Sequence, residues 1–215
     1  MNIASYIDHT LLKPDSTVEQ VVKLCAEARY HSFASVCILP WHVRRAADEI
    51  SGSGVAVCTV VGFPLGANIT SIKVAEAEEA IRQGATEIDM VAAITALKSR
   101  RYDDVFSDIR AVVEACHGRG AIVKVIIETC LLNDDEKKRM CATVTQAGAD
   151  YIKTSTGFST GGATIEDVAL LFSNVGPSVK VKASGGIRDA HTAVAMINAG
   201  ASRLGTSSGV GIVSA

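Results

Sequence analysis

The sequence predicts an α/β fold, a TIM (β/α)8 barrel formed by a single domain over residues 1–215. Segments with strand-like and helix-like patterns alternate along the whole chain, and the connections between them are short. The strand-like segments are almost wholly apolar, which is typical of a parallel sheet that is covered by helices. Eight such segments occur in 215 residues, and no linker or low-complexity segment divides the chain.

The predicted strands are short, and turn-forming or polar residues bound most of them. They cover residues 6–12, 33–39, 55–61, 87–92, 122–128, 151–154, 179–183 and 203–206. Pro40 ends the second strand, because proline has no amide hydrogen to donate to a sheet. A glycine- and proline-containing segment, Gly62-Phe63-Pro64-Leu65-Gly66, ends the third strand.

Helical periodicity fills the segments between these strands. The first helix follows a capping segment, Asp15-Ser16-Thr17, and has apolar residues at positions 18, 21, 22, 25 and 28. The later helices are expected at residues 41–50, 69–83, 97–117, 133–146, 164–172 and 190–198. The helix over 97–117 has a possible break at Arg100-Arg101.

A glycine-alanine pair follows three of the helical segments, at Gly84, Gly148 and Gly200. Glycine at such a position ends a helix in a left-handed turn. The residues five positions later are Asp89, Lys153 and Gly205. Because this spacing is constant, we expect the three residues at similar depths in the barrel, near the strand ends where TIM barrels hold their active sites.

Composition excludes several classes of protein. The net charge is −2, from 21 basic and 23 acidic residues, and no basic run suggests a nucleic-acid partner. No window of 18 apolar residues suggests a membrane span, and residues 1–9 do not resemble a signal peptide. The six cysteines show no CxxC spacing, which argues against disulfides and structural zinc and favours the reducing cytoplasm.

Lys153 lies in a short apolar strand and is followed directly by hydroxyl residues and Gly157. An apolar environment lowers the pKa of a lysine, and a second nearby cation lowers it further. A neutral lysine is a nucleophile that can form a Schiff base with a carbonyl compound. The alternative is a lysine at the end of a strand that extends to water.

The two-residue period of a strand places several charged residues on one face. If Lys153 points into the barrel, the same parity directs four other residues inward, namely Asp89, Lys124, Glu128 and Lys182. Charged side chains are seldom buried without partners. This pattern fits a catalytic cluster. It also fits a purely structural ion-pair network, or lysines that reach water at the strand mouths. Lys180 has the same parity as Lys182, but it lies at the start of its strand, where a side chain reaches solvent.

Two loops rich in glycine and hydroxyl residues follow the seventh and eighth strands. One contains Gly185, Gly186 and Arg188 ahead of a helix, and the other contains Gly205, Ser207 and Ser208. Glycines after a strand let backbone N–H groups approach an anion. TIM barrels commonly bind phosphate at these two loops.

No sequence pattern indicates a metal or a nucleotide cofactor. GxGxxG and P-loop motifs are absent, and the five histidines have neither HxH nor HExxH spacing. His9 and His42 are therefore expected to be structural or surface residues. Cys37, near the end of its strand, could face the site, although a small core residue is the simpler interpretation.

Seven motifs resemble, in order along nearly the whole chain, those of the deoxyribose-phosphate aldolase family. They are Asp8-His9-Thr10-Leu11-Leu12, Ser35-Val36-Cys37, Gly62-Phe63-Pro64, Glu87-Ile88-Asp89-Met90-Val91, Val123-Lys124-Val125-Ile126-Ile127-Glu128-Thr129, Tyr151-Ile152-Lys153-Thr154-Ser155-Thr156-Gly157-Phe158 and Val181-Lys182-Ala183-Ser184-Gly185-Gly186-Ile187-Arg188. The resemblance implies a class I aldolase without metal or other cofactor. It would reversibly cleave 2-deoxy-D-ribose 5-phosphate into glyceraldehyde 3-phosphate and acetaldehyde.

The resemblance also implies roles for individual residues. Lys153 would form the Schiff base, Lys182 would perturb its pKa, and Asp89 would relay protons. The loops at Gly157, Gly185-Gly186 and Gly205 to Ser208 would hold the phosphate. Five supporting residues are expected around them, namely Asp8, Thr10, Cys37, Lys124 and Arg188. A protonated imine accepts the electrons of the breaking carbon–carbon bond, which removes the need for a metal.

Some family members end in a longer tail with a terminal tyrosine implicated in proton transfer. This sequence ends at Ser214-Ala215, so we expect that contribution to be absent or replaced. Two other functions remain open, namely a different phosphosugar Schiff-base aldolase or transaldolase, and a non-catalytic barrel that binds a phosphate ligand. The expected partners are phosphosugar and aldehyde substrates and further copies of the chain in a dimer or tetramer, with no nucleic acid and no membrane.

Overall fold

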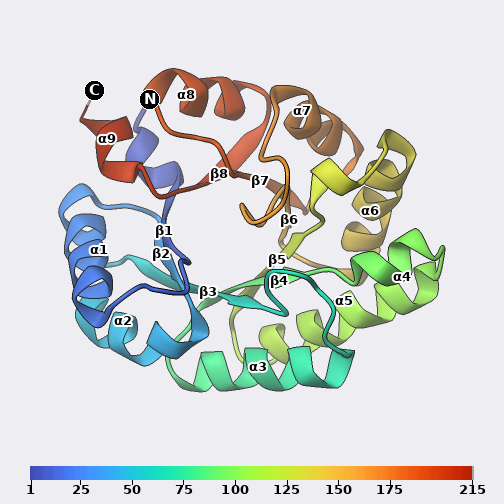
Figure 1. The fold of residues 1–215 in the computed structure, drawn as a ribbon, viewed down its shortest axis with the longest axis horizontal. Coiled ribbons are helices and arrows are strands. Elements are labelled where there is room, and N and C mark those ends of the chain that lie inside the picture. Colours follow the sequence, from blue (N-terminus) through green and yellow to red (C-terminus); the bar gives the residue numbers. More distant parts are fainter. Residues whose placement is uncertain (215) are drawn as a thin grey trace.

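Eight parallel strands close into a barrel in the computed structural model, which describes residues 1–214 (Figure 1). Each strand pairs with the next along the chain, and β8 pairs with β1. The strands are β1 (Ile7–Leu11), β2 (Ser35–Ile38), β3 (Ala56–Val61), β4 (Glu87–Val91), β5 (Ile122–Ile126), β6 (Tyr151–Lys153), β7 (Lys180–Ser184) and β8 (Ala201–Thr206). The predicted TIM barrel is confirmed.

Helices surround the barrel on its outside (Figure 1). They are α1 (Val18–His31), α2 (Val43–Ile50), α3 (Thr70–Arg82), α4 (Ile94–Lys98), α5 (Tyr102–His117), α6 (Asp134–Ala147), α7 (Ile165–Asn174), α8 (Ala190–Asn198) and α9 (Gly209–Val213), with 3-10 helices at Ile3–Tyr6, Pro40–His42 and Thr129–Leu131. Thr17 and Asn133 begin α1 and α6 with reciprocal capping boxes. Each such cap satisfies backbone donors that the first helical turn leaves free.

Most element bounds lie within one or two residues of the sequence prediction, and two of the differences have a clear cause in the backbone. The helix expected over 97–117 is α4 followed by α5, because Arg100 has a φ of 59° and cannot continue a helix. The strand expected over 122–128 ends at Ile126, since Glu128 is also left-handed, with a φ of 52°. The alternation of the strand therefore stops before Glu128, and its parity does not place that side chain.

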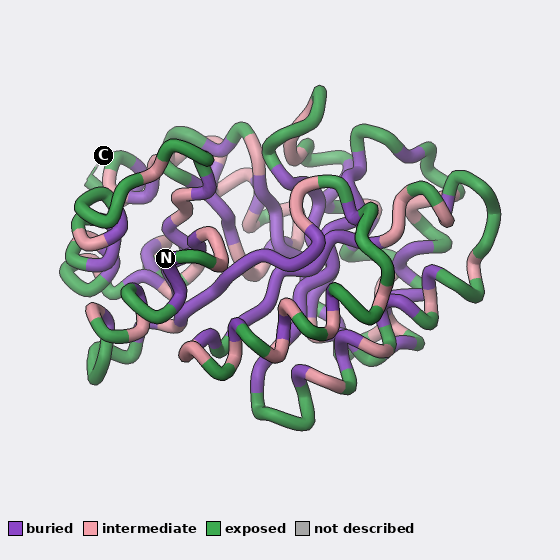
Figure 2. The backbone as a smooth tube through the Cα atoms, turned by 60° about the horizontal axis from the view of Figure 1, so that its bottom comes forward, coloured by how far each residue is buried: buried purple, intermediate pink, exposed green. Residues whose placement is uncertain are grey.

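The main hydrophobic core lies between the barrel and its helices. Figure 2 shows the buried central strands surrounded by helices with exposed outer faces. Outward-facing strand residues such as Ile88, Val123 and Ile152 are fully buried against this layer. Burying such a side chain contributes about 1.5–3 kcal/mol, so this layer supplies most of the stability.

The interior of the barrel is unusually polar. TIM barrels usually fill this space with branched apolar side chains. Here the separate apolar cluster comprises only Leu12, Cys37, Cys58 and Val60. Charged groups from β1, β4, β5, β6, β7 and β8 occupy much of the remaining interior. Ions in a low-dielectric interior destabilise a fold unless they are closely paired. A charged barrel interior therefore indicates a functional site.

None of the helices formed by residues 1–214 is both long and apolar enough to cross a membrane. All six cysteines are free thiols, and five of them are buried.

Candidate active site

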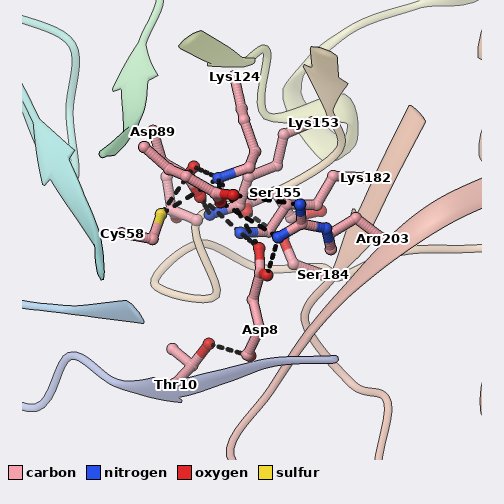
Figure 3. Close-up of polar contacts among 12 residues, drawn as sticks. Asp8, Thr10, Cys58, Asp89, Lys124, Lys153, Ser155, Lys182, Ser184 and Arg203 are labelled. Atoms are coloured by element: carbon pink, nitrogen blue, oxygen red, sulfur yellow. Dashed lines mark hydrogen bonds and ion pairs between the residues drawn. The ribbon is translucent and has the colours of Figure 1, made fainter. Parts of the chain in front are cut away.

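Asp89 of β4 is the centre of the charged cluster inside the barrel (Figure 3). Its Oδ2 atom lies 2.8 Å from Lys153 Nζ and 2.7 Å from Lys182 Nζ, and its Oδ1 atom lies 2.8 Å from Lys124 Nζ. Because β4 pairs with neither β6 nor β7, the contacts to Lys153 and Lys182 cross the interior. The structure thus brings together four of the five residues that strand parity directs inward, and their ion pairs converge on the carboxylate of Asp89.

A second carboxylate, Asp8 of β1, holds the next part of the cluster. Its Oδ2 atom lies 2.5 Å from Lys182 Nζ, and its Oδ1 atom lies 2.6 Å from Arg203 Nη1. Arg203 also donates hydrogen bonds from both terminal nitrogens to the Glu87 carboxylate at 3.1 Å. Glu87 Oε2 in turn lies 2.6 Å from Lys124 Nζ. Ion pairs therefore link Asp8, Glu87, Arg203 and the lysines into one closed network.

The network keeps Asp8, Asp89 and Lys182 ionised. Burial raises the pKa of the Asp89 carboxyl, but Lys124, Lys153 and Lys182 lower it more, and the result is well below the usual range. The same competition, with Lys182 as the strongest cation, lowers the pKa of Asp8. Burial lowers the pKa of Lys182, but Asp8 and Asp89 raise it more, so Lys182 remains an ammonium.

Only one lysine of the cluster reaches the open cavity beside it. Lys153 lines a cavity of about 400 Å³ at the C-terminal ends of the strands, whereas Lys124 and Lys182 are fully buried and do not line it. Of the three lysines, Lys153 also has the fewest charged partners, since within residues 1–214 its one ion pair is with Asp89. A small molecule in the cavity therefore meets the amine of Lys153 and not those of the other two lysines.

The far wall of the cavity is formed by the loop after β7. Gly185 and Gly186 have φ values of 85° and 84°, a left-handed conformation that glycine adopts without strain. A Cβ atom at Gly186 would meet no atom within 4 Å, so the backbone there faces open space. Asp189 caps α8 directly after this loop, and Arg188 lines the same cavity. Exposed backbone, a helix N-terminus and a cation together favour an anion.

Gly205 has a different local role from the loop glycines. A Cβ atom there would lie 2.8 Å from Ser184 Cβ and 3.3 Å from Lys182 Cε. The missing side chain therefore makes room for Lys182 as well as exposing backbone to the cavity. Ser207 lines the cavity, whereas Ser208 lies outside its lining and donates its N–H to Thr206 Oγ1 at 2.9 Å.

The remaining residues singled out from the sequence lie at different distances from the cavity. Gly157 and Thr10 line it, and the Thr10 hydroxyl donates to the backbone oxygen of Asp8 at 2.8 Å. Cys37 is buried in the small apolar cluster beside Cys58 and does not line the cavity. His9 is buried and bonds Glu27 at 2.8 Å, which is a structural contact. The expectation about a C-terminal tail concerns Ala215, which lies outside the described residues.

Glu128 anchors the loop that follows β6. It accepts hydrogen bonds from the backbone N–H and hydroxyl of Thr156, and Phe158 N donates to the same hydroxyl at 3.0 Å. Phe158 packs edge-to-face on Phe63, with ring centroids 5.2 Å apart. Glu128 therefore holds the cavity wall and, contrary to the expectation from strand parity, does not join the lysine cluster.

Two groups of side chains in the cluster have the spacing of metal ligands. They are Cys37, Cys58 and Asp89, and Asp8, Cys58 and Glu87, with ligand atoms within 4.8 Å of one another in each group. Every carboxylate in them already contacts at least two ammonium or guanidinium groups. A divalent cation would be repelled by these charges, so the donor sets do not fit a metal.

Sequence reasoning missed Arg203 and Lys13. Arg203 has the parity of Gly205 in the last strand, so the alternation that selected the other residues could also have found it. Lys13 lines the cavity from the loop after β1, and no motif pointed to it. A buried pair outside the site, Lys73 and Asp108 at 2.6 Å, was also missed, because nothing in helical periodicity predicts it.

Known proteins resemble this chain over its whole length. The sequence model of the DeoC/LacD family of aldolases matches residues 2–215. The deoxyribose-phosphate aldolase of Brevibacillus brevis is 60% identical over 213 residues, which cover 99% of this chain and 96% of that protein. The deoxyribose-phosphate aldolase of Bacillus subtilis is 57% identical over 213 residues, covering 99% and 95% of the two chains.

Solved structures agree with these relatives. The tetrameric deoxyribose phosphate aldolase from Aeropyrum pernix superposes with a TM-score of 0.92 at 37% identity, covering 99% of this chain and 89% of that one. High identity over nearly the full length of both proteins, together with a lysine-rich barrel interior and an open cavity, leads to one assignment. The chain belongs to the DeoC/LacD family of aldolases.

Proposed function

We propose that this lyase reversibly cleaves 2-deoxy-D-ribose 5-phosphate into D-glyceraldehyde 3-phosphate and acetaldehyde, through a Schiff base on Lys153. The observation that carries the proposal is the position of Lys153. It is the only lysine of the buried cluster that lines the cavity, and it shares one carboxylate oxygen with the ammonium of Lys182. An amine in such a place can meet a carbonyl carbon while the ammonium of Lys182 beside it opposes its protonation.

The reaction follows from this arrangement. The Lys153 amine adds to the aldehyde carbon of the open-chain sugar, and loss of water leaves a protonated imine. A base removes the proton of the C3 hydroxyl, the C2–C3 bond breaks, and its electron pair moves into the imine to give an enamine and glyceraldehyde 3-phosphate. Protonation of the enamine at C2 and hydrolysis release acetaldehyde and the free amine. Asp89 and Lys182, which surround Lys153 Nζ, are the groups that exchange these protons, directly or through water.

The direct test is a cleavage assay with 2-deoxyribose 5-phosphate that follows both aldehyde products. Release of the two products in equal amounts is expected. In the reverse direction acetaldehyde should serve as the donor and dihydroxyacetone phosphate should not. Turnover of dihydroxyacetone phosphate would indicate another phosphosugar aldolase, and binding of the sugar phosphate without turnover would indicate a non-catalytic barrel.

Activity is expected to be unchanged after dialysis against EDTA. The protonated imine supplies the electron sink that a divalent metal supplies in other aldolases, and the carboxylates of the site are already paired with cations. Initial rates before and after dialysis test this. Activity that disappears in EDTA and returns with added divalent metal would contradict the Schiff-base proposal.

Gly186→Ala is expected to raise the KM for 2-deoxyribose 5-phosphate by about 10-fold or more, with a much smaller effect on unphosphorylated deoxyribose. The new methyl group would extend into the open space that the backbone of Gly186 faces, and the φ of 84° would be strained for alanine. Steady-state kinetics with both sugars separate the two effects. Equal losses with both would place phosphate recognition elsewhere.

We further propose that residues 1–215 form a single aldolase domain that acts in the cytoplasm as a homo-oligomer. Free buried thiols support a reducing environment, and the tetramer of the Aeropyrum pernix relative supports self-association. Light scattering on the purified protein would measure the number of copies.

A further inference from the structure

We propose that Glu87 and Arg203, which do not line the cavity, are positioning residues whose charges help set whether the Lys153 amine carries a proton. The inference rests on the proposed role of Lys153 as the nucleophile. It assigns a function to the lower part of the ion-pair network, which the reaction itself does not use.

The first support is the balance of charge in the network. Its carboxylates are Asp8, Glu87 and Asp89, and its cations other than Lys153 are Lys124, Lys182 and Arg203. These three negative and three positive charges cancel without any contribution from Lys153. A proton on Lys153 would therefore add an uncompensated charge to a buried cluster, which is costly in a medium of low polarity.

The second support is the way partners are distributed among the cations. Lys124 contacts three carboxylates, Lys182 contacts two, and Arg203 contacts two. Lys153 contacts one carboxylate oxygen, which it shares with Lys182, and it alone of the three lysines borders the cavity. When the network holds one positive charge too many, Lys153 is thus the member that loses its proton most readily.

Other titratable groups near Lys153 do not change this balance. Burial raises the pKa of the Cys58 thiol, which donates to Asp89 at 3.1 Å, and the polar contact with Cys58 lowers the pKa of Cys37. Cys58 is therefore an uncharged thiol. Glu128 has its hydrogen bonds from Thr156, with no cation of the network within salt-bridge distance. Lys180 is exposed at the start of β7, so its charge is screened by water.

Substitution of Glu87 or Arg203 changes the charge balance of the network without touching the cavity. Arg203 bonds Glu87 through two nitrogens and Asp8 through one, and Asp8 in turn contacts Lys182. Neither Glu87 nor Arg203 lines the cavity, so replacing them leaves the cavity wall unchanged. We therefore expect these two residues to act on Lys153 electrostatically.

The sign of each effect follows from the charge removed. Arg203→Met leaves the network with an excess negative charge, which favours the ammonium form of Lys153 and shifts the appearance of the free amine to higher pH. Glu87→Gln leaves an excess positive charge, which disfavours the ammonium form of Lys153, so the free amine appears at lower pH. The double variant restores the balance and should return the profile to that of the wild type.

The readout is the rate at which acetaldehyde and cyanoborohydride modify Lys153, followed by quantitative peptide mass spectrometry between pH 5 and 10. Acetaldehyde has no phosphate, so titration of the substrate does not enter. We expect shifts of about one pH unit or more, alkaline for Arg203→Met and acidic for Glu87→Gln. Arg203→Lys keeps the charge and should keep the wild-type profile even where its melting temperature is lower.

Asp108→Asn is the matched control. It removes a carboxylate that is buried against Lys73 at 2.6 Å, outside the network, so it should lower the melting temperature without moving the profile. If both network variants lose stability and the profile stays in place, Glu87 and Arg203 are structural only and the inference is overturned. Should Arg203→Met fail to fold, the nearly isosteric Glu87→Gln decides alone, because a shift that is absent or alkaline contradicts the proposal.

The two proposals fail in different ways. If Lys153 of the wild type acquires no adduct, the Schiff-base function itself is wrong. If the adduct forms in every variant with the same pH profile, the function stands and the inference about Glu87 and Arg203 does not.

Discussion

Lys153→Arg is expected to abolish turnover of 2-deoxyribose 5-phosphate, with a loss of at least about 10⁴-fold in kcat/KM. Arginine keeps a positive charge beside Asp89 but cannot form an imine, so the substitution separates nucleophilicity from electrostatics. In the wild type, borohydride should reduce the imine to a stable secondary amine. Mass mapping should then find the adduct on the peptide that contains residues 151–158.

The location of the adduct distinguishes the remaining possibilities. An adduct on Lys124 or Lys182 would transfer the role of nucleophile to a lysine that is fully buried in the free protein. Turnover preserved in Lys153→Arg, with no adduct anywhere, would refute the Schiff-base mechanism. Circular dichroism of the variant is the necessary control, since a change in a buried network can also reduce the folded fraction.

Lys182→Leu is expected to lower kcat/KM by about 10²–10⁴-fold and to shift the remaining pH profile to the alkaline side. Removal of this ammonium leaves Asp8 and Asp89 with an excess negative charge that favours the protonated form of Lys153. Free amine then appears only at higher pH. Rates measured from pH 6 to 10 test this, and a normal rate with an unchanged profile would show that Lys182 has no part in the reaction.

Stability should fall in the same variant. Loss of one partner leaves two buried carboxylates incompletely paired, which costs about 3–5 kcal/mol. Lys73→Leu is a matched control, because Lys73 is equally buried and pairs with Asp108 outside the cluster. A comparable loss of melting temperature is expected there, with no alkaline shift of the profile. The shift of the profile, and not the loss of stability, identifies the role of Lys182.

Much of the fold could be predicted from the sequence because its patterns are local. Alternation of apolar strands with amphipathic helices indicated eight βα units, and the structure confirms a closed eight-stranded barrel. The two-residue period of the strands directed Asp89, Lys124, Lys153 and Lys182 to one face, and the structure brings these four side chains together. The constant distance from a helix-ending glycine to Asp89 and Lys153 reflects the equal length of these connections.

Tertiary structure decided which of these residues meet, and which one opens to the cavity. Strand parity selects a face but not a depth, because depth depends on how the eight strands are staggered around the barrel. Arg203 and Glu87 are 116 residues apart and Lys182 and Asp89 are 93 apart, so no local pattern relates the members of either pair. Likewise, the strand pattern predicted an inward-facing Glu128, and the left-handed backbone there directs it instead to Thr156. The residue types and their faces come from the sequence, whereas the closed charge network and the one lysine of the cluster that lines the cavity exist only once the barrel closes.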